Sequence, residues 1–222
     1  MLTWAFFLLV RHPKALEKVL EEMKANNIDL TTITRRELQK MTYLQNVLRE
    51  TIQLYPPVPI SERVANRSTT LATGEGPNRA APILVPKGTT VTYSVYARHR
   101  RPDLYGMDAE KLRPDRWDEH MPLHNEKMNA AWGYLPFNGG PRIYLRSWYS
   151  SDYNIEKALT RSLAADFALT EAAYVLARIL SHFPQIRLPA NSKVELTGVE
   201  KQTVTLVLSS TEGCMVDLTA RN

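Results

Sequence analysis

The chain lacks the cysteines that a disulfide or a zinc site needs. Cys214 is the only cysteine among 222 residues, so neither an intramolecular disulfide nor a cysteine-based zinc site can form. Long runs of one charge are also lacking: the formal net charge is +5, and the densest basic stretch is Arg98-x-Arg100-Arg101. We therefore expect no nucleic-acid partner. A mildly basic face would suit an acidic redox partner, or would simply be solvated.

No apolar run is long enough to span a membrane. The start of the chain, Met1 to Val10, is apolar but only about half the length of a spanning helix. It has no basic region before it and no small-residue cleavage site, as a signal peptide would have. We expect a buried helix of which this chain contains only the later part, so that the chain would be truncated at its front.

Helical periodicity is clear in the first part of the chain. Arg11-His12-Pro13 ends the first helix, and apolar residues at helical spacing predict a second helix to about Ala25. Thr34-x-x-Glu37 is a capping box that opens a short helix. Thr42-x-x-Gln45 should open another, which Pro56-Pro57 ends.

Short strands are predicted in two places. Between Ile60 and Tyr96, segments separated by glycine- and proline-rich turns are typical of strands. There Val91, Tyr93 and Val95 alternate with polar residues, as in a half-buried strand. Three terminal strands are predicted near the end of the chain: Val194–Leu196, Thr203–Leu208 and Met215–Leu218.

A long helix is predicted before those terminal strands. Its apolar stripe recurs at helical spacing and consists of Phe167, Ala168, Ala172, Val175, Leu176, Ile179, Leu180 and Phe183.

Two histidines have a spacing that a metal site on a helix would use. His120 and His124 lie four apart, but Pro122 stands between them. We expect a loop there without a ligand role, so these histidines predict no metal site.

The stretch from Trp132 to Leu145 has the composition of a rigid loop that a flat ligand can approach. The adjacent Gly139 and Gly140 permit close approach to the main chain, and Phe137 offers an aromatic face. Arg142 carries a fixed fork of donors that suits a carboxylate.

This stretch resembles the haem-binding loop of the cytochrome P-450 family, Phe-x-x-Gly-x-Arg-x-Cys-x-Gly. Phe137, Gly140 and Arg142 match the pattern, but Tyr144 stands at the cysteine position and Arg146 at the last glycine. The resemblance implies that Phe137, Gly140, Arg142 and Tyr144 bind the cofactor, with Tyr144 at the place of the axial iron ligand.

Two further motifs resemble the same family. Glu50 and Gln53 stand where the family has Glu-x-x-Arg, so Gln53 replaces an arginine. Arg116 lies in a run similar to the family's Pro-Glu-Arg-Phe segment. The resemblance implies that Glu50, Gln53 and Arg116 form the catalytic scaffold and that Glu50 pairs with Arg116. By itself, a Glu/Gln pair three apart on a helix is almost always a solvated face.

The resemblance also assigns Arg63 to the cofactor. In the family, the small sheet that contains this position lies beside the haem, so Arg63 would face a propionate. The alternative is an exposed arginine on an edge strand.

The implied fold is mainly α with small β-sheets (α+β), the C-terminal part of the cytochrome P-450 fold, truncated before the end of the central long helix. We expect one partial domain, 1–222. Residues 1–145 would form the helices, the small sheet, the meander and the haem loop. Residues 146–166 would form an atypical insert, and residues 167–222 would form the last long helix and the terminal strands.

The function implied by the resemblance is that of a haem monooxygenase. The motifs look most like those of fungal enzymes that hydroxylate alkanes and fatty acids, receive electrons from an NADPH-dependent reductase and are anchored to the endoplasmic reticulum. Three hypotheses stay open: a truncated and inactive family member, which we favour, a haem protein with a tyrosine ligand and at most peroxidase-like activity, or a non-enzymatic protein-binding module. An unspliced intron would explain the insert.

We expect the stretch from Ser147 to Asp166 to be poorly packed, because it has few apolar positions and the family fold has no cavity for it. Limited proteolysis should therefore cut there first. A first cut between Leu169 and Phe183 would show instead that the insert is integrated into the fold.

Overall fold

The computed structural model describes residues 1–26, 33–125, 132–139, 163–190, 192 and 201–219. The helices in these ranges are α1 (Leu2–Arg11), α2 (Pro13–Ala25), α3 (Arg35–Lys40), α4 (Thr42–Leu54), α5 (Val95–Arg98), α6 (Pro102–Tyr105), the 3₁₀ helices η1 (Pro114–Asp118) and η2 (Pro122–His124), and α9 (Leu163–His182). The strands are β1 (Ile60–Val64), β2 (Thr69–Glu75), β3 (Ala81–Val85), β4 (Thr90–Ser94), β5 (Gln185–Arg187), β6 (Gln202–Val204), β7 (Leu208–Ser210) and β8 (Asp217–Thr219).

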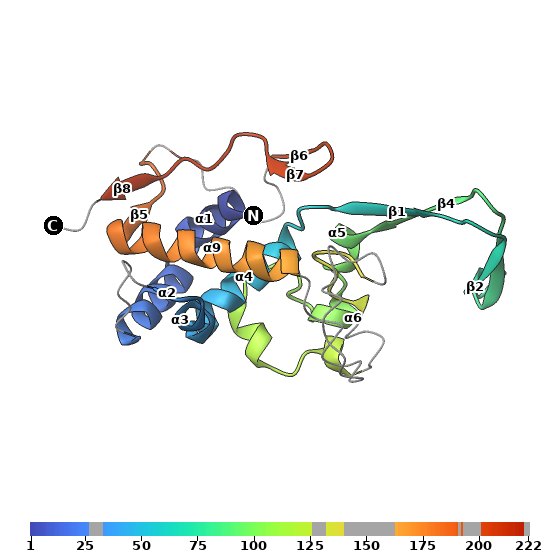
Figure 1. The fold of residues 1–222 in the computed structure, drawn as a ribbon, viewed down its shortest axis with the longest axis horizontal. Helices are drawn as coiled ribbons and strands as arrows, with labels where there is room; N and C mark the ends of the chain where they lie inside the picture. Colours follow the sequence, from blue (N-terminus) through green and yellow to red (C-terminus); the bar gives the residue numbers. More distant parts are fainter. Residues whose placement is uncertain (27–32, 126–131, 140–162, 191, 193–200, 220–222) are drawn as a thin grey trace.

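Helices α1, α2, α4 and α9 enclose the main apolar core (Figure 1). Leu9, Val19, Leu44 and Leu48 are fully buried in it, because their spacing places each on the inner face of its helix. Beside this core, the ring of Trp4 stacks on that of Tyr55, with centroids 4.0 Å apart. The expected buried helix at Met1–Val10 is therefore confirmed.

The strands form two-stranded antiparallel pairs: β1 with β4, β2 with β3, β5 with β8 and β6 with β7. Ile60 pairs with Ser94, and Val64 with Thr90. This pair extends away from the helices, with β2 at its far end (Figure 1). Among the described residues, no helix is long and apolar enough to cross a membrane.

Several expectations about local structure are confirmed. The capping box is present, because Thr34 accepts from the Glu37 N–H while the Glu37 carboxylate accepts from the Thr34 N–H. Pro13 occupies the first turn of α2. In β4, Val91 and Tyr93 are half-buried and alternate with exposed residues.

Other expectations are corrected. Val95 begins α5 rather than continuing the strand. The single strand predicted from Thr203 to Leu208 is a hairpin, because β6 ends at Val204 and β7 begins at Leu208. Of the predicted strand Met215–Leu218, only Asp217 and Leu218 lie in the observed strand β8, which pairs with β5, a strand that the pattern did not predict. Val194–Leu196 lies outside the described residues.

The last long helix differs from its expected form at its beginning. It starts at Leu163, so part of the predicted insert is helical. Phe167, placed on the apolar stripe, is 69% exposed, whereas Ala173 and Ala177 are fully buried. The rest of the insert, up to residue 162, lies outside the described residues.

The N-terminus of α4 is capped from another helix. Thr42 is its first helical residue and makes no side-chain cap, which corrects the expectation for Thr42-x-x-Gln45. Instead, the Glu22 carboxylate of α2 accepts from the Tyr43 N–H at 2.8 Å and from the Leu44 N–H at 2.9 Å. This carboxylate supplies both acceptors and a negative charge at the positive end of α4.

We predict that Glu22→Ala lowers the free energy of unfolding by roughly 1–2 kcal/mol, because two N–H groups at the start of α4 lose their acceptor. Urea denaturation measures the change. Glu21→Ala is the matched control, since Glu21 is the exposed neighbouring glutamate. Equal effects of the two substitutions would show that Glu22 does not cap α4.

Candidate functional site

The centre of the candidate site is a buried ion pair between α4 and η1. The Glu50 carboxylate and the Arg116 guanidinium are both fully buried, with Arg116 Nε and Glu50 Oε1 3.0 Å apart. The predicted pairing is confirmed. Glu50 therefore does not lie on a solvated face, although its local pattern is typical of one.

The Glu50 carboxylate has further donors. The Arg113 backbone N–H donates to Oε1 at 2.8 Å, and the Trp117 indole N–H donates to Oε2 at 2.8 Å. Burial raises the pKa of Glu50 to about 7, while Arg116, Arg113 and Trp117 oppose that shift. These donors are what makes a buried carboxyl tolerable at this position.

The Arg116 guanidinium also binds backbone carbonyls around it. It donates to the carbonyl of Tyr105 at 2.7 Å, that of Asp108 at 2.8 Å and that of Lys111 at 3.0 Å. Arg116 therefore fixes the irregular chain between α6 and η1 as well as binding α4. This planar, multiple donation is a task for which arginine is suited and lysine is not.

Gln53 lies fully buried one turn after Glu50 and does not bond it in the structure. Its amide Nε2 donates to the carbonyls of His99 and Ala109, the latter at 2.9 Å. Its Oε1 is buried and has no hydrogen-bond partner in the described part of the chain. Gln53 thus connects α4 to the same irregular chain that Arg116 holds.

The beginning of the glycine-rich loop is held through its backbone. The Leu135 N–H donates to His99 Nε2 at 2.8 Å. The Tyr105 hydroxyl donates to the Gly133 carbonyl at 3.0 Å, and Arg98 Nε donates to the Trp132 carbonyl at 2.6 Å. The sequence analysis did not identify these contacts, and no local pattern distinguishes His99 from a surface histidine.

The tip of the described loop is tied to the β1–β4 pair. Asn138 has a positive φ of 70°, and its side chain accepts from the Tyr93 hydroxyl and donates to Ser61 Oγ at 3.0 Å. A Cβ on Gly139 would come within 2.9 Å of the Trp132 ring, so a larger residue there would require that ring to shift. Asparagine before two glycines is a signal for such a turn that could have been used.

The predicted cofactor residues are only partly described. Phe137 is half-buried in the loop. Arg63 is exposed on β1, where it donates to the Glu62 carbonyl at 2.7 Å, which agrees with the edge-strand alternative. Gly140, Arg142 and Tyr144 lie outside the described residues, so their predicted roles stay predictions.

The two histidines lie close together, and His124 is the last residue of the short 3₁₀ helix η2, so the expected loop contains one helical turn. The ring centroids of His120 and His124 are 6.0 Å apart, and His120 Nε2 lies 2.8 Å from the Asn125 side-chain oxygen. No cluster of three metal-binding side chains exists among the described residues.

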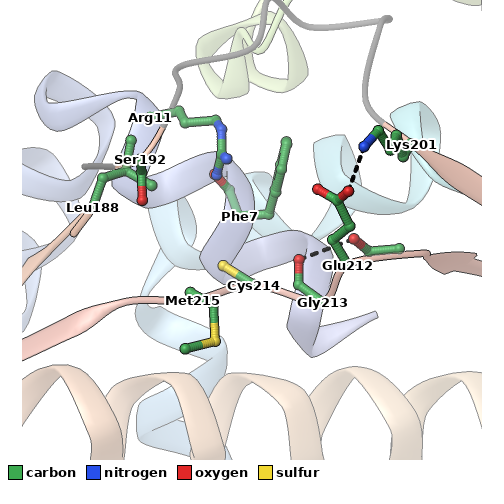
Figure 2. A pocket seen from close by; sticks show the side chains of 10 residues that line it. Phe7, Arg11, Leu188, Ser192, Lys201, Glu212, Gly213, Cys214 and Met215 are labelled. Atoms are coloured by element: carbon green, nitrogen blue, oxygen red, sulfur yellow. Dashed lines mark hydrogen bonds and ion pairs between the residues drawn. The ribbon is translucent and has the colours of Figure 1, made fainter. Parts of the chain in front are cut away.

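Cys214 lies elsewhere in the fold. Figure 2 shows it beside Arg11 and Phe7 of α1, in an open cavity of about 390 Å³. Burial raises the pKa of its thiol, and Arg11 opposes that shift. No described residue of the glycine-rich loop lines this cavity, because the described part of the loop contacts His99, Tyr105 and Tyr93 instead.

The chain belongs to the cytochrome P-450 family, whose family model matches residues 1–143. A cytochrome P-450 of Arthroderma benhamiae is 41% identical over an alignment of 222 positions that covers 98% of this chain and 40% of the relative. Cytochrome P-450 52A13 of Debaryomyces hansenii is 39% identical over 94% of this chain and 38% of its own length. The cytochrome P-450 monooxygenase milC of Cordyceps militaris is 41% identical over 82% and 30%.

This chain therefore spans about 40% or less of the length of these curated relatives. The family implies a haem, and the described residues allow its fit to be tested. The close packing of Gly139 and the positive φ of Asn138 suit a backbone-built loop. The family model ends at residue 143 and Tyr144 lies outside the described residues, so the assignment of Tyr144 to the position of the iron ligand stays a prediction.

We predict that Arg116→Met lowers the free energy of unfolding by roughly 3–5 kcal/mol, because it leaves Glu50 buried without its countercharge. Chemical denaturation measures the loss. Arg113→Met is the matched control, since its side chain is 41% exposed and its backbone contact to Glu50 survives. Arg113→Met should lower the free energy of unfolding by no more than about 1 kcal/mol. A similar decrease for both variants would contradict the assignment of Arg116 as the buried partner of Glu50.

Proposed function

We propose that this chain is part of a family member related to monooxygenases that hydroxylate alkanes or fatty acids, and that it has lost haem-thiolate chemistry of its own. Several of its relatives belong to the 52A group of fungal cytochromes P-450, and two others are named as monooxygenases. For the whole family member of which this chain would be part, the proposal includes hydroxylation of apolar substrates, electrons from an NADPH-dependent reductase and attachment to the endoplasmic reticulum.

The proposal rests on a contrast between the buried contacts around the loop, which are present, and the residue at the position of the iron ligand, which differs from the family pattern. The buried contacts of Glu50, Arg116 and Gln53 hold the chain around the loop in place. The position that would supply the iron ligand is Tyr144. A chain with a preserved scaffold and an altered ligand is expected to fold like its family without performing the family's reaction.

Tyrosine does not replace the thiolate chemically. When bound, a thiolate-ligated haem supplies activated oxygen, and electron donation from sulfur favours cleavage of the O–O bond. A phenol begins from a pKa near 10 and reaches further from the backbone than a thiol. Arg146 adds a side chain where the family pattern has a glycine, which restricts the turn of the loop.

Gln53 contributes less to the loss than Tyr144. The family pattern has an arginine there, but the glutamine amide still donates to the carbonyls of His99 and Ala109. Relative to the family pattern, glutamine at this position removes one positive charge, so the Glu50 carboxylate faces only the Arg116 guanidinium. The site keeps its connection to the irregular chain and changes only its net charge.

We predict that reduced haem with carbon monoxide, added to this chain, gives an ordinary haem spectrum without the red-shifted band of thiolate ligation. The control is Tyr144→Cys with residues 147–164 deleted, placed behind the N-terminal half of a relative, which should produce that band. A thiolate band from the unmodified chain would overturn the proposal and identify Cys214 as the ligand.

The same titration separates the other two hypotheses. Stoichiometric haem uptake with peroxidase activity that Tyr144→Phe abolishes would favour a tyrosine-ligated haem protein. Absence of uptake by a chain that circular dichroism shows to be folded would favour a protein-binding module.

A further inference from the structure

His99 joins the end of α4 to the beginning of the glycine-rich loop. Its side chain is fully buried, its carbonyl accepts from Gln53 Nε2, and its ring Nε2 accepts from the Leu135 N–H at 2.8 Å. One residue thus contacts α4 through its backbone and the loop through its ring.

The contact with Leu135 determines the protonation state of the ring. Because Nε2 accepts from an N–H group, it cannot itself carry a proton, and the neutral ring must carry its proton on Nδ1. Nδ1 is buried and makes no hydrogen bond in the described part of the chain. A second proton would have to occupy Nε2, where it would oppose the Leu135 N–H.

The surroundings of the ring disfavour that second proton. Tyr134 stacks on the ring at 5.3 Å between centroids, and Tyr105 lies edge-on at 6.2 Å. The pKa of His99 is lowered to about 4, chiefly by burial and to a smaller extent by the cations Arg100 and Arg98, while the nearby backbone carbonyls of Gln53 and Ile52 oppose this shift.

Other charged groups near this end of α4 are engaged elsewhere. Glu50, one turn before Gln53, is bonded to Arg116 in the ion pair described above. The charge state of the ring is thus set mainly by its own burial and by the carbonyls of α4.

The direction of the pH effect follows from this lowered pKa. Between about pH 4 and the ordinary histidine value near 6.5, the unfolded chain binds a proton at His99 that the folded chain does not. The contribution of His99 to stability is therefore complete above about 6.5 and is lost as the pH falls toward about 4.

We propose that His99 is a pH-sensitive latch, in which the neutral ring holds the beginning of the glycine-rich loop against α4 and the protonated ring releases it. The structural basis is the single acceptor at Nε2, which only the neutral ring can offer to Leu135. The latch does not depend on the identity of residue 144 or on haem, so it goes beyond the proposed function.

Hydrogen exchange followed by mass spectrometry on the full 222-residue chain tests the latch. Exchange of a peptide covering residues 132–139 is compared with that of a peptide within α4, from pH 7 to pH 4, after correction for the intrinsic rate. We expect the loop to lose protection at least tenfold near pH 4 while α4 keeps its own. Simultaneous loss in both peptides would overturn the latch.

The decisive variant is His99→Gln, whose side-chain oxygen can accept from Leu135 but does not titrate in this range. Its loop protection should be independent of pH. His120→Gln is the matched control, because His120 is exposed, and it should keep the transition of the unmodified chain. A loop in His99→Gln that opens at the same pH as in the unmodified chain would refute the proposal.

If His99→Gln does not fold, NMR of the unmodified chain gives the answer. The ring signals of His99 and the amide signal of Leu135 should titrate with the same midpoint, because they report one event. Different midpoints, or a ring that shows no titration while the loop opens, would refute the latch.

Discussion

The arrangement of the chain around the loop depends on the buried pair of Glu50 and Arg116. Both side chains are inaccessible to solvent, so the pair is stable only while each charge keeps its full set of partners. Arg116 reaches the carbonyls of Tyr105, Asp108 and Lys111 from this position. Helix α4 and the irregular chain are thereby fixed as one unit, and the loop is attached to that unit.

Gln53 connects α4 to the irregular chain without contributing a charge. An amide has two N–H donors and no charge, and Gln53 directs its donors to the carbonyls of His99 and Ala109. The remaining cost is the buried Oε1, which has no partner in the described residues.

Local signals predicted local structure well and long-range structure poorly. Periodicity identified the first helices, and the Thr34 capping box formed as expected, because both depend on residues within one turn. The cap of α4 was mispredicted because Glu22 acts from another helix. Glu50 alone has the pattern of a solvated residue, and its partner is 66 positions away. Only the family motifs, which carry such distant pairings, indicated that it would be buried.

The loop contacts explain why fold and chemistry can separate in this chain. His99, Tyr105 and Arg98 hold the loop through the Leu135 N–H and the carbonyls of Gly133 and Trp132. Backbone atoms are the same in every residue, so these contacts do not depend on which side chain follows at position 144. An iron ligand, in contrast, is one side chain alone. A substitution of such a ligand would leave the buried pair of Glu50 and Arg116 and the backbone contacts of the loop unchanged, so the proposed loss of haem-thiolate chemistry is compatible with a preserved scaffold.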